Sequence, residues 1–216
     1  MCANRQKTGT ANNGDEAPLP VAAALILAAG AATRMGSLKQ LLPFGQGTLI
    51  SNAIEQAKDA CFETIVVVVG AQGDLVTLAT GQQGVEIVEN PDWPSGMGTS
   101  IRVGLEHITK QAPGPEVLAV LLADQPLVRA SHLLEMRRMQ AKSRAPILAA
   151  QYSGQNGVPA LFARDLFPSL AALPADAGAR HLLRGGSFPV LSFPLPEAAT
   201  DVDTPADFAR LAMVRP

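Results

Sequence analysis

The chain has few cysteines and histidines, and their positions exclude several kinds of site. Its 216 residues include only two cysteines, Cys2 and Cys61, and no C-x-x-C pair. Because that pair is typical of thiol redox chemistry and of structural zinc, neither is expected. Cys2 lies in a polar segment and Cys61 follows a predicted helix, so no disulfide is expected. The histidines, His107, His132 and His181, are far apart in sequence and predict no metal site.

A large excess of charge of either sign is also lacking. Seventeen Lys and Arg residues against nineteen Asp and Glu residues give a formal net charge of −2. We therefore expect no nucleic-acid partner and no anionic membrane surface, which both require a net basic face. The net charge still allows the binding of one small anionic ligand, because such a ligand needs only a local cluster of basic residues. With 47% hydrophobic and 17% charged residues, the composition is that of a globular domain.

No hydrophobic run is long enough to span a membrane. Residues 21–32 have the length of a signal-peptide core and follow Arg5 and Lys7. However, Asp15 and Glu16 lie between these basic residues and the run, and the run leads directly into the best motif of the chain. We therefore expect a cytoplasmic protein.

Strand-like and helix-like segments alternate along most of the chain. Residues 1–20 lack apolar periodicity and are expected to form a disordered leader before a single domain at 21–216. Continuous apolar strands between helices predict a mostly parallel sheet with helices on both faces, a Rossmann-like three-layer α/β sandwich. Strands are expected at 22–28, 64–69, 84–89, 116–122, 146–152, 158–163 and 188–193, and helices at 48–60, 72–80, 98–110, 130–142, 163–171, 177–184 and 204–213.

The most informative stretch is residues 27–43, LAAGAATRMGSLKQLLP. An apolar strand ends at Gly30, and Arg34, Gly36 and Lys39 follow within ten residues. Glycines let backbone N–H groups approach a ligand closely, and successive N–H groups form an anion-binding concavity. The stretch therefore predicts a phosphate loop, although a turn with two solvated basic side chains would also fit these residues.

The spacing of this loop differs from two common phosphate motifs. Five residues separate Gly30 from Gly36 and Ser37 follows, so neither G-x-x-x-x-G-K-[ST] nor G-x-G-x-x-G fits. The second predicted strand ends at Gly70 rather than at an acidic residue. A dinucleotide-dependent dehydrogenase is therefore not favoured.

Four candidate residues follow four different predicted strands. Gly30, Gly70, Asn90 and Asp124 each lie within two residues of the end of a predicted strand, and ligands of open α/β sheets bind outside the carboxyl ends of the strands. Asp124 ends a buried strand, where an unpaired carboxylate is costly. It is a candidate ligand for Mg²⁺, which is typically held by one or two carboxylates and substrate phosphates. The alternative for Asp124 is a turn residue before Pro126.

These segments together resemble a known enzyme family. The motifs occur along the chain in the same order as in the MobA-like nucleotidyltransferases, and the chain resembles this family. Within it, the resemblance is greatest to the molybdenum cofactor cytidylyltransferases of the MocA type. The resemblance covers about residues 22–212 and implies a nucleotide-diphospho-sugar transferase-like fold. It rests on residues 27–43 and on NPDWPSGMGTS at 90–100, LADQP at 122–126, GVPALF at 157–162, GAR at 178–180 and DVDTP at 201–205.

The resemblance implies a role for particular residues of these segments. Arg34 and Lys39 would hold the triphosphate and the developing pyrophosphate, and Asp124 would bind Mg²⁺; these three are the implied catalytic residues. Arg180 is the implied acceptor-binding residue, although a solvated helix arginine would fit equally. Trp93 is expected to pack rather than to stack on a pterin. The implied nucleotide-binding residues are Leu27, Ala28, Ala29, Gly30, Arg34, Lys39, Gly70, Asn90, Gly98 and Asp124.

By the same resemblance, Asp203 is the second metal ligand, with Asp201 as the next choice. The segment also reads as a helix start, with Thr204 as N-cap, Pro205 at the first helical position and Asp207 in a capping box. That interpretation leaves Asp201 and Asp203 without an assigned role.

The implied reaction is attack by a phosphate oxygen of molybdopterin, or of the molybdenum cofactor, on the α-phosphorus of CTP, with release of pyrophosphate. A phosphate monoester has a second pKa of about 6, so it needs no general base. CTP is favoured because residues 27–30 read LAAG and 124–126 read DQP, where the guanylyltransferases usually have LAGG and DMP.

Two alternatives stay open at this stage. The acceptor could instead be a sugar or polyol phosphate, because the acceptor half has no decisive motif. A non-catalytic maturation factor that hands cofactor to a molybdenum hydroxylase is the third possibility. The joint presence of Arg34, Lys39, Asp124 and Asp203 argues against it, because a degenerate binder need not keep this set of charges.

Overall fold

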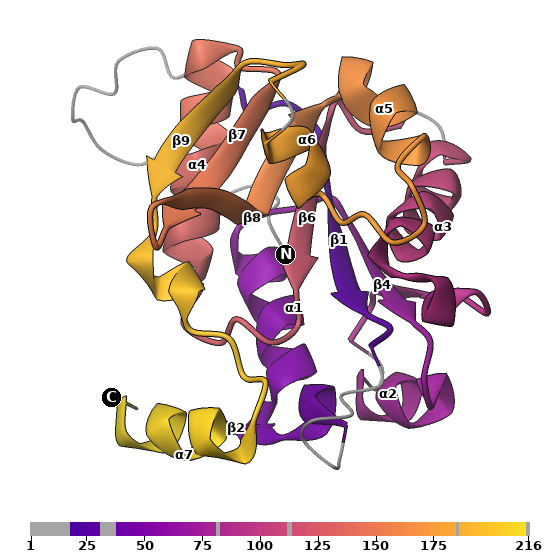
Figure 1. Ribbon diagram of the computed structural model, residues 1–216, viewed down its shortest axis with the longest axis vertical. Helices are drawn as coiled ribbons and strands as arrows, with labels where there is room; N and C mark the ends of the chain where they lie inside the picture. The colour runs from indigo at the N-terminus through magenta and orange to yellow at the C-terminus, as the bar shows by residue number, and fades with distance from the viewer. Residues whose placement is uncertain (1–17, 31–37, 81–82, 112–113, 185, 215–216) are drawn as a thin grey trace, which may run out of the picture.

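The computed structural model describes residues 18–30, 38–80, 83–111, 114–184 and 186–214. The main strands are β1 (Ala22–Ala28), β4 (Thr64–Val69), β5 (Glu86–Glu89), β6 (Val117–Leu122), β7 (Ile147–Tyr152), β8 (Gln155–Ala163) and β9 (Val190–Pro194). They form one seven-stranded sheet in the order β5-β4-β1-β6-β8-β7-β9 (Figure 1). A separate hairpin consists of β2 (Pro43–Phe44) and β3 (Gly47–Thr48).

The sheet is mostly parallel, as the sequence predicts. β1 pairs in parallel with β4 and β6, and β4 with β5. All of β1 is buried, which explains why its sequence is apolar throughout rather than alternating. β8 runs antiparallel to both β6 and β7. The hairpin between β7 and β8 turns at Ser153 and Gly154, whose φ angles of +51° and +74° are those of a tight two-residue turn.

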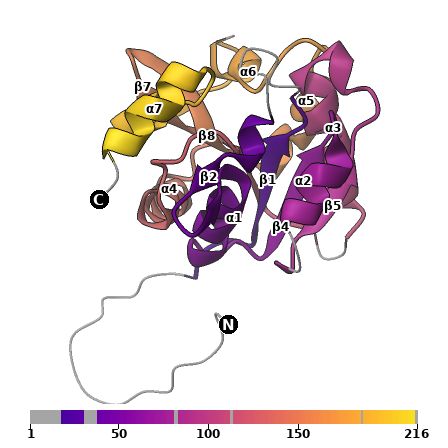
Figure 2. The same cartoon turned by 90° about the horizontal axis from the view of Figure 1, so that it is seen from below.

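Helices cover both faces of this sheet, so the predicted three-layer α/β sandwich is confirmed (Figure 2). On one face Ile26 of β1 packs in a cluster with Ile54, and on the other Leu25 packs with Ile101 and Leu170. The helices are α1 (Leu49–Asp59), α2 (Gly73–Thr80), α3 (Met97–Thr109), α4 (Ala130–Ser143), α5 (Phe167–Ala171), α6 (Arg180–Arg184) and α7 (Pro205–Val214), with short 3-10 helices η1 (Lys39–Leu41), η2 (Trp93–Ser95), η3 (Arg164–Leu166) and η4 (Pro196–Ala199).

The expected helices and strands are all present, with small changes at their ends. The strand expected at 84–89 and the helix expected at 177–184 are shorter, and the strand expected at 158–163 begins earlier, at Gln155. The predicted helix at 163–171 is η3 followed by α5. The proposed leader lies almost entirely outside the described residues. No described helix combines the length and the apolar character that a membrane span requires.

Candidate active site

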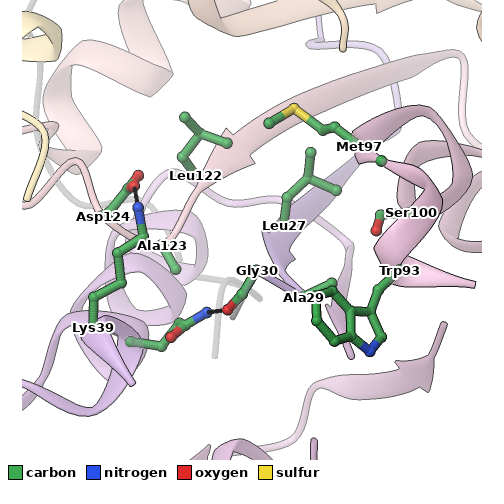
Figure 3. Close-up of a pocket in the computed structure, with 12 residues that line it drawn as sticks. Leu27, Ala29, Gly30, Lys39, Trp93, Met97, Ser100, Leu122, Ala123 and Asp124 are labelled. Carbon is green, nitrogen blue, oxygen red and sulfur yellow. Dashed lines mark hydrogen bonds and ion pairs between the residues drawn. The ribbon is translucent and has the colours of Figure 1, made fainter. Parts of the chain in front are cut away.

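A pocket of about 330 Å³ lies at the carboxyl ends of β1 and β6 (Figure 3). β1 has β4 on one side and β6 on the other, so the chain connections diverge here, and such a divergence point is where open α/β sheets bind ligands. The pocket is lined by Leu27, Ala29, Gly30, Lys39, Gln40, Trp93, Gly96, Met97, Ser100, Leu122, Ala123 and Asp124.

Lys39 connects two carboxylates that are far apart in sequence. Its Nζ donates hydrogen bonds to Asp124 Oδ2 and, over 2.8 Å, to Asp203 Oδ1. Burial acts to lower the pKa of Lys39, but the charges and hydrogen bonds of Asp124 and Asp203 outweigh burial and raise it above 10.5. The ammonium is therefore charged at neutral pH and lies between the two carboxylates.

Asp124 has more acceptor capacity than its observed contacts use. It is 9% exposed, and its Oδ1 is buried with no hydrogen-bond partner among the described residues. Burial raises the pKa of Asp201, and the negative charges of Asp203 and Asp124 raise it further. Negative potential is thus concentrated beside the pocket, and the Lys39 ammonium offsets part of it.

Gln40 holds the end of β1 and the start of the predicted phosphate loop. Its side chain is buried, and Nε2 donates to the carbonyls of Ala28 and Gly30 over 2.9 and 3.0 Å. The sequence did not single out Gln40, because its burial depends on contacts with β1 that local pattern does not reveal. Arg34 lies outside the described residues.

Two predicted nucleotide-binding residues lie behind the pocket wall rather than on it. Asn90 is fully buried, and its Nδ2 donates to Thr99 Oγ1 and Ser100 Oγ over 2.8 and 2.9 Å. Asn90 therefore ties the end of β5 to the first turn of α3. A Cβ on Gly70 would lie 2.7 Å from the side chain of Trp93, so the absence of a side chain there lets Trp93 reach the pocket.

Gly98 and Arg180 are likewise not among the described residues that line the pocket. Gly98 donates its N–H to the Ala175 carbonyl over 2.9 Å, and this contact holds α3 against the chain before α6. Arg180 is exposed at the start of α6. A Cβ on Gly178 would lie 2.9 Å from Met97 Sδ, so the chain leading to Arg180 contacts a pocket-lining residue. The structure thus brings Lys39 into direct contact with both Asp124 and Asp203, whereas the exposed Arg180 is not among the described residues that line the pocket.

A family model of the MobA-like NTP transferase domain matches residues 24–190, a span that includes most of β1 together with Lys39 and Asp124. The chain belongs to this family. The predicted resemblance is confirmed, and it makes the chain a member of the nucleotidyltransferase superfamily.

Individual relatives of this MobA-like chain carry different names. Nicotine blue oxidoreductase of Paenarthrobacter nicotinovorans is 31% identical over 204 residues, covering 89% of this chain and 97% of that protein. The molybdenum cofactor cytidylyltransferase of Escherichia coli (strain K12) is 26% identical over 185 residues, covering 85% and 92%.

Solved structures agree with the fold. The crystal structure of a Mycobacterium tuberculosis H37Rv protein superimposes with a TM-score of 0.76 at 28% identity, covering 90% of this chain and 100% of that one. The same mycobacterial protein has also been crystallised in complex with manganese, and that structure has a TM-score of 0.73 at 27% identity over the same shares of both chains.

Proposed function

We propose that this protein is a Mg²⁺-dependent cytidylyltransferase that transfers CMP from CTP to the phosphate of molybdopterin or the molybdenum cofactor and releases pyrophosphate. The observation that carries the proposal is the contact of Lys39 with Asp124 and Asp203 at the edge of the pocket. A nucleotidyltransferase needs this combination, because it must hold a polyanion and a cation at one place.

The residues at this place fit a divalent cation. Asp124 and Asp203 present carboxylate oxygens to a common cation, which in this structure is the Lys39 ammonium, and the buried Asp124 Oδ1 is available as a further ligand. Mg²⁺ prefers such oxygen ligands and, when bound, would neutralise the charge of the α-phosphate. The manganese complex of the mycobacterial relative supports the use of a divalent metal by this chain.

The side chains of the protein would act mainly by neutralising phosphate charge and by positioning the substrates. With a second pKa of about 6, an acceptor phosphate is already ionised, so its oxygen can attack the α-phosphorus without a general base. The new P–O bond forms as the bond to pyrophosphate breaks, and Lys39 would leave the carboxylates to neutralise the departing pyrophosphate. Arg34 is proposed to assist it.

Support for CTP and for the acceptor comes from sequence. Residues 27–30 read LAAG, and the cytidylyltransferase of E. coli is 26% identical across most of both chains. Arg180, exposed at the start of α6, is the proposed contact for the acceptor phosphate. A cytoplasmic protein that passes its product to a molybdenum hydroxylase would be consistent with this activity.

A second candidate activity comes from the other relative. Nicotine blue oxidoreductase is 31% identical to this chain over nearly the full length of both. An oxidoreductase needs an electron carrier, whereas a nucleotidyltransferase needs a nucleoside triphosphate and a divalent metal. Ligand binding therefore distinguishes the two candidates.

Thermal unfolding with a panel of ligands tests the proposal. The panel contains CTP, GTP, UTP, ATP, NADH and NADPH, each with and without Mg²⁺. A ligand at about 100 times its Kd stabilises the fold by about 2.7 kcal/mol, which raises the Tm of a domain of this size by roughly 5–10 °C. We expect this rise for CTP with Mg²⁺, and its loss in Asp124→Asn.

Asp59→Asn is the matched control, because Asp59 is an exposed carboxylate at the far end of α1. It should keep the full response to CTP. A larger rise with GTP would overturn the choice of base, and a rise with NADH or NADPH alone would favour the oxidoreductase. A response to no nucleotide would favour the maturation factor, and a normal CTP response with no transfer to molybdopterin would favour a sugar or polyol phosphate acceptor.

A further inference from the structure

Gln125 directly follows the candidate metal ligand Asp124, yet it is not among the described residues that line the pocket. Its side chain is 6% exposed, and Nε2 donates to the carbonyls of Val158 and Ala198 over 3.0 and 2.8 Å. The first carbonyl belongs to β8 and the second to η4. One buried amide group therefore joins three segments that are far apart in sequence.

Two of these segments lead to the carboxylates of the site: Asp124 directly precedes Gln125, and η4 leads into the segment that carries Asp203. The backbone N–H of Val202 donates to the Asp124 carbonyl over 3.1 Å, and Asp203 follows directly in the chain. Val202 is fully buried in a small cluster with Leu49 and Leu211. The turn after β6 is thus attached to the segment before α7 at two points, one through Val202 and one through the Gln125 side chain.

Packing alone does not explain a glutamine at this position. Gln125 Oε1 is buried with no hydrogen-bond partner among the described residues, which is a cost that an apolar side chain of the same length would avoid. The Val158 carbonyl also accepts a hydrogen bond from Tyr152 over 3.1 Å, so Gln125 is not its only donor. What the Gln125 amide contributes beyond packing is therefore the connection between the turn after β6, β8 and η4.

Two carboxylates that share a cation repel each other, so their separation must be imposed by the surrounding structure. We propose that Gln125 is a positioning residue that fixes the separation of Asp124 and Asp203 by tying the turn after β6 to η4. This inference rests on the proposed function, because it takes the two carboxylates as the metal ligands. Partners that orient metal ligands typically contribute 10–100-fold to metal affinity.

The test is a titration of the full-length protein with Mn²⁺ alone, in which the free ion is followed by electron paramagnetic resonance. Gln125→Met keeps the length and volume of the side chain but removes the donor. We expect its Kd for Mn²⁺ to rise about 10-fold or more. Gln125→Asn keeps an amide but is one methylene too short to reach both carbonyls, and it tests the same link if the methionine variant does not fold.

Gln140→Met is the matched control. Gln140 is also buried, its Nε2 donates to the Ala145 carbonyl over 3.4 Å, and its Oε1 has no partner among the described residues. It lies on α4, away from the pocket, so its replacement should change the Tm without changing the Kd for Mn²⁺.

Three results would count against the inference. If both Gln125 variants bind Mn²⁺ as the wild type does while Asp124→Asn binds it weakly, Gln125 has no positioning role and the proposed function is unaffected. If Gln140→Met weakens Mn²⁺ binding as much as Gln125→Met, the effect is general destabilisation. If the wild type itself shows no saturable Mn²⁺ binding, the metal site of the proposed function fails together with the inference.

Discussion

Lys39 is the residue at which the two carboxylate segments of the site meet. Asp124 follows β6 and Asp203 precedes α7, and the ammonium contacts both. The ammonium offsets their charge, and in the proposed reaction it would neutralise the phosphates instead. The same side chain would therefore contact both the carboxylates and the substrate.

Replacement of Lys39 should lower turnover more than nucleotide binding. Removal of one preorganised charge donor typically costs about 10²–10³-fold in kcat, and we expect Lys39→Ala to fall in this range. The measurement is steady-state pyrophosphate release with CTP varied, which separates kcat from KM. Lys110→Ala, an exposed lysine at the end of α3, is the control. A change in the KM for CTP alone would contradict the role assigned to Lys39.

The sequence predicted most of the elements and a part of the site. Buried strands are long apolar runs, and the helix start at Thr204 and Pro205 has its own local signal. Both are properties of neighbouring residues. The contact of Lys39 with Asp203 spans 164 positions, and only the resemblance to a family suggested that the two act together. The burial of Gln40 and Gln125 had no local signal, because both residues are buried by elements distant in sequence.

At the scale of elements, α7 begins with the capping box that the sequence predicts. The Asp207 side chain accepts from Thr204 N over 2.8 Å, and Asp207 N donates to Thr204 Oγ1 over 3.3 Å. The hydrogen bonds from Thr204, together with Arg210, lower the pKa of Asp207 from 3.8 to about 2. Because α7 follows Asp203, the cap also fixes where the helix after the site begins.

The lowered pKa of Asp207 gives α7 a defined pH dependence. A carboxyl group whose pKa is lower in the folded state stabilises the fold above its unfolded pKa, and this contribution is lost as the pH falls through the folded value. The Tm difference between wild type and Asp207→Ala should therefore be full at pH 7 and shrink as the pH falls from about 4 to about 2. Thermal unfolding by circular dichroism measures it, and a difference independent of pH would contradict the ionic cap.

The first turn of α3 depends on close contact with the chain before α6. A Cβ on Gly98 would lie 2.1 Å from the Pro174 carbonyl oxygen and 2.8 Å from that of Ala177. Because these are backbone atoms, they cannot move away from an added methyl group as easily as side-chain atoms could. Gly98→Ala should lower the free energy of unfolding by about 1–3 kcal/mol, the usual cost of overpacking, measured by urea denaturation.

Gly30→Ala provides the contrast, because a Cβ there has no atom of the described residues within 4 Å. It should leave the free energy of unfolding nearly unchanged but weaken CTP binding, since its added methyl group would meet the nucleotide rather than the protein. If Gly98→Ala were as stable as Gly30→Ala, the close approach of α3 to residues 174–177 would not be a constraint on the fold.

At the scale of the whole molecule, the sheet order explains how distant segments form one site. β1 lies between β4 and β6, so the chain after β1 and the chain after β6 meet at one edge, and the segment before α7 returns to the same edge. Helices on both faces bury the strands, and the pocket lies at the carboxyl ends of β1 and β6 (Figure 3). The sheet order thus determines where the pocket lies, and the charged groups beside it are Lys39, Asp124 and Asp203.

The most direct test of the central claim is the transfer reaction itself. Purified protein is incubated with CTP, Mg²⁺ and molybdopterin, and the cytosine dinucleotide and pyrophosphate are quantified by chromatography and mass spectrometry. We predict that both products form in equal amounts, that CTP exceeds GTP as donor, and that Asp124→Asn abolishes the reaction. Wild-type protein that binds molybdopterin and forms neither product from any nucleoside triphosphate would contradict the proposed activity.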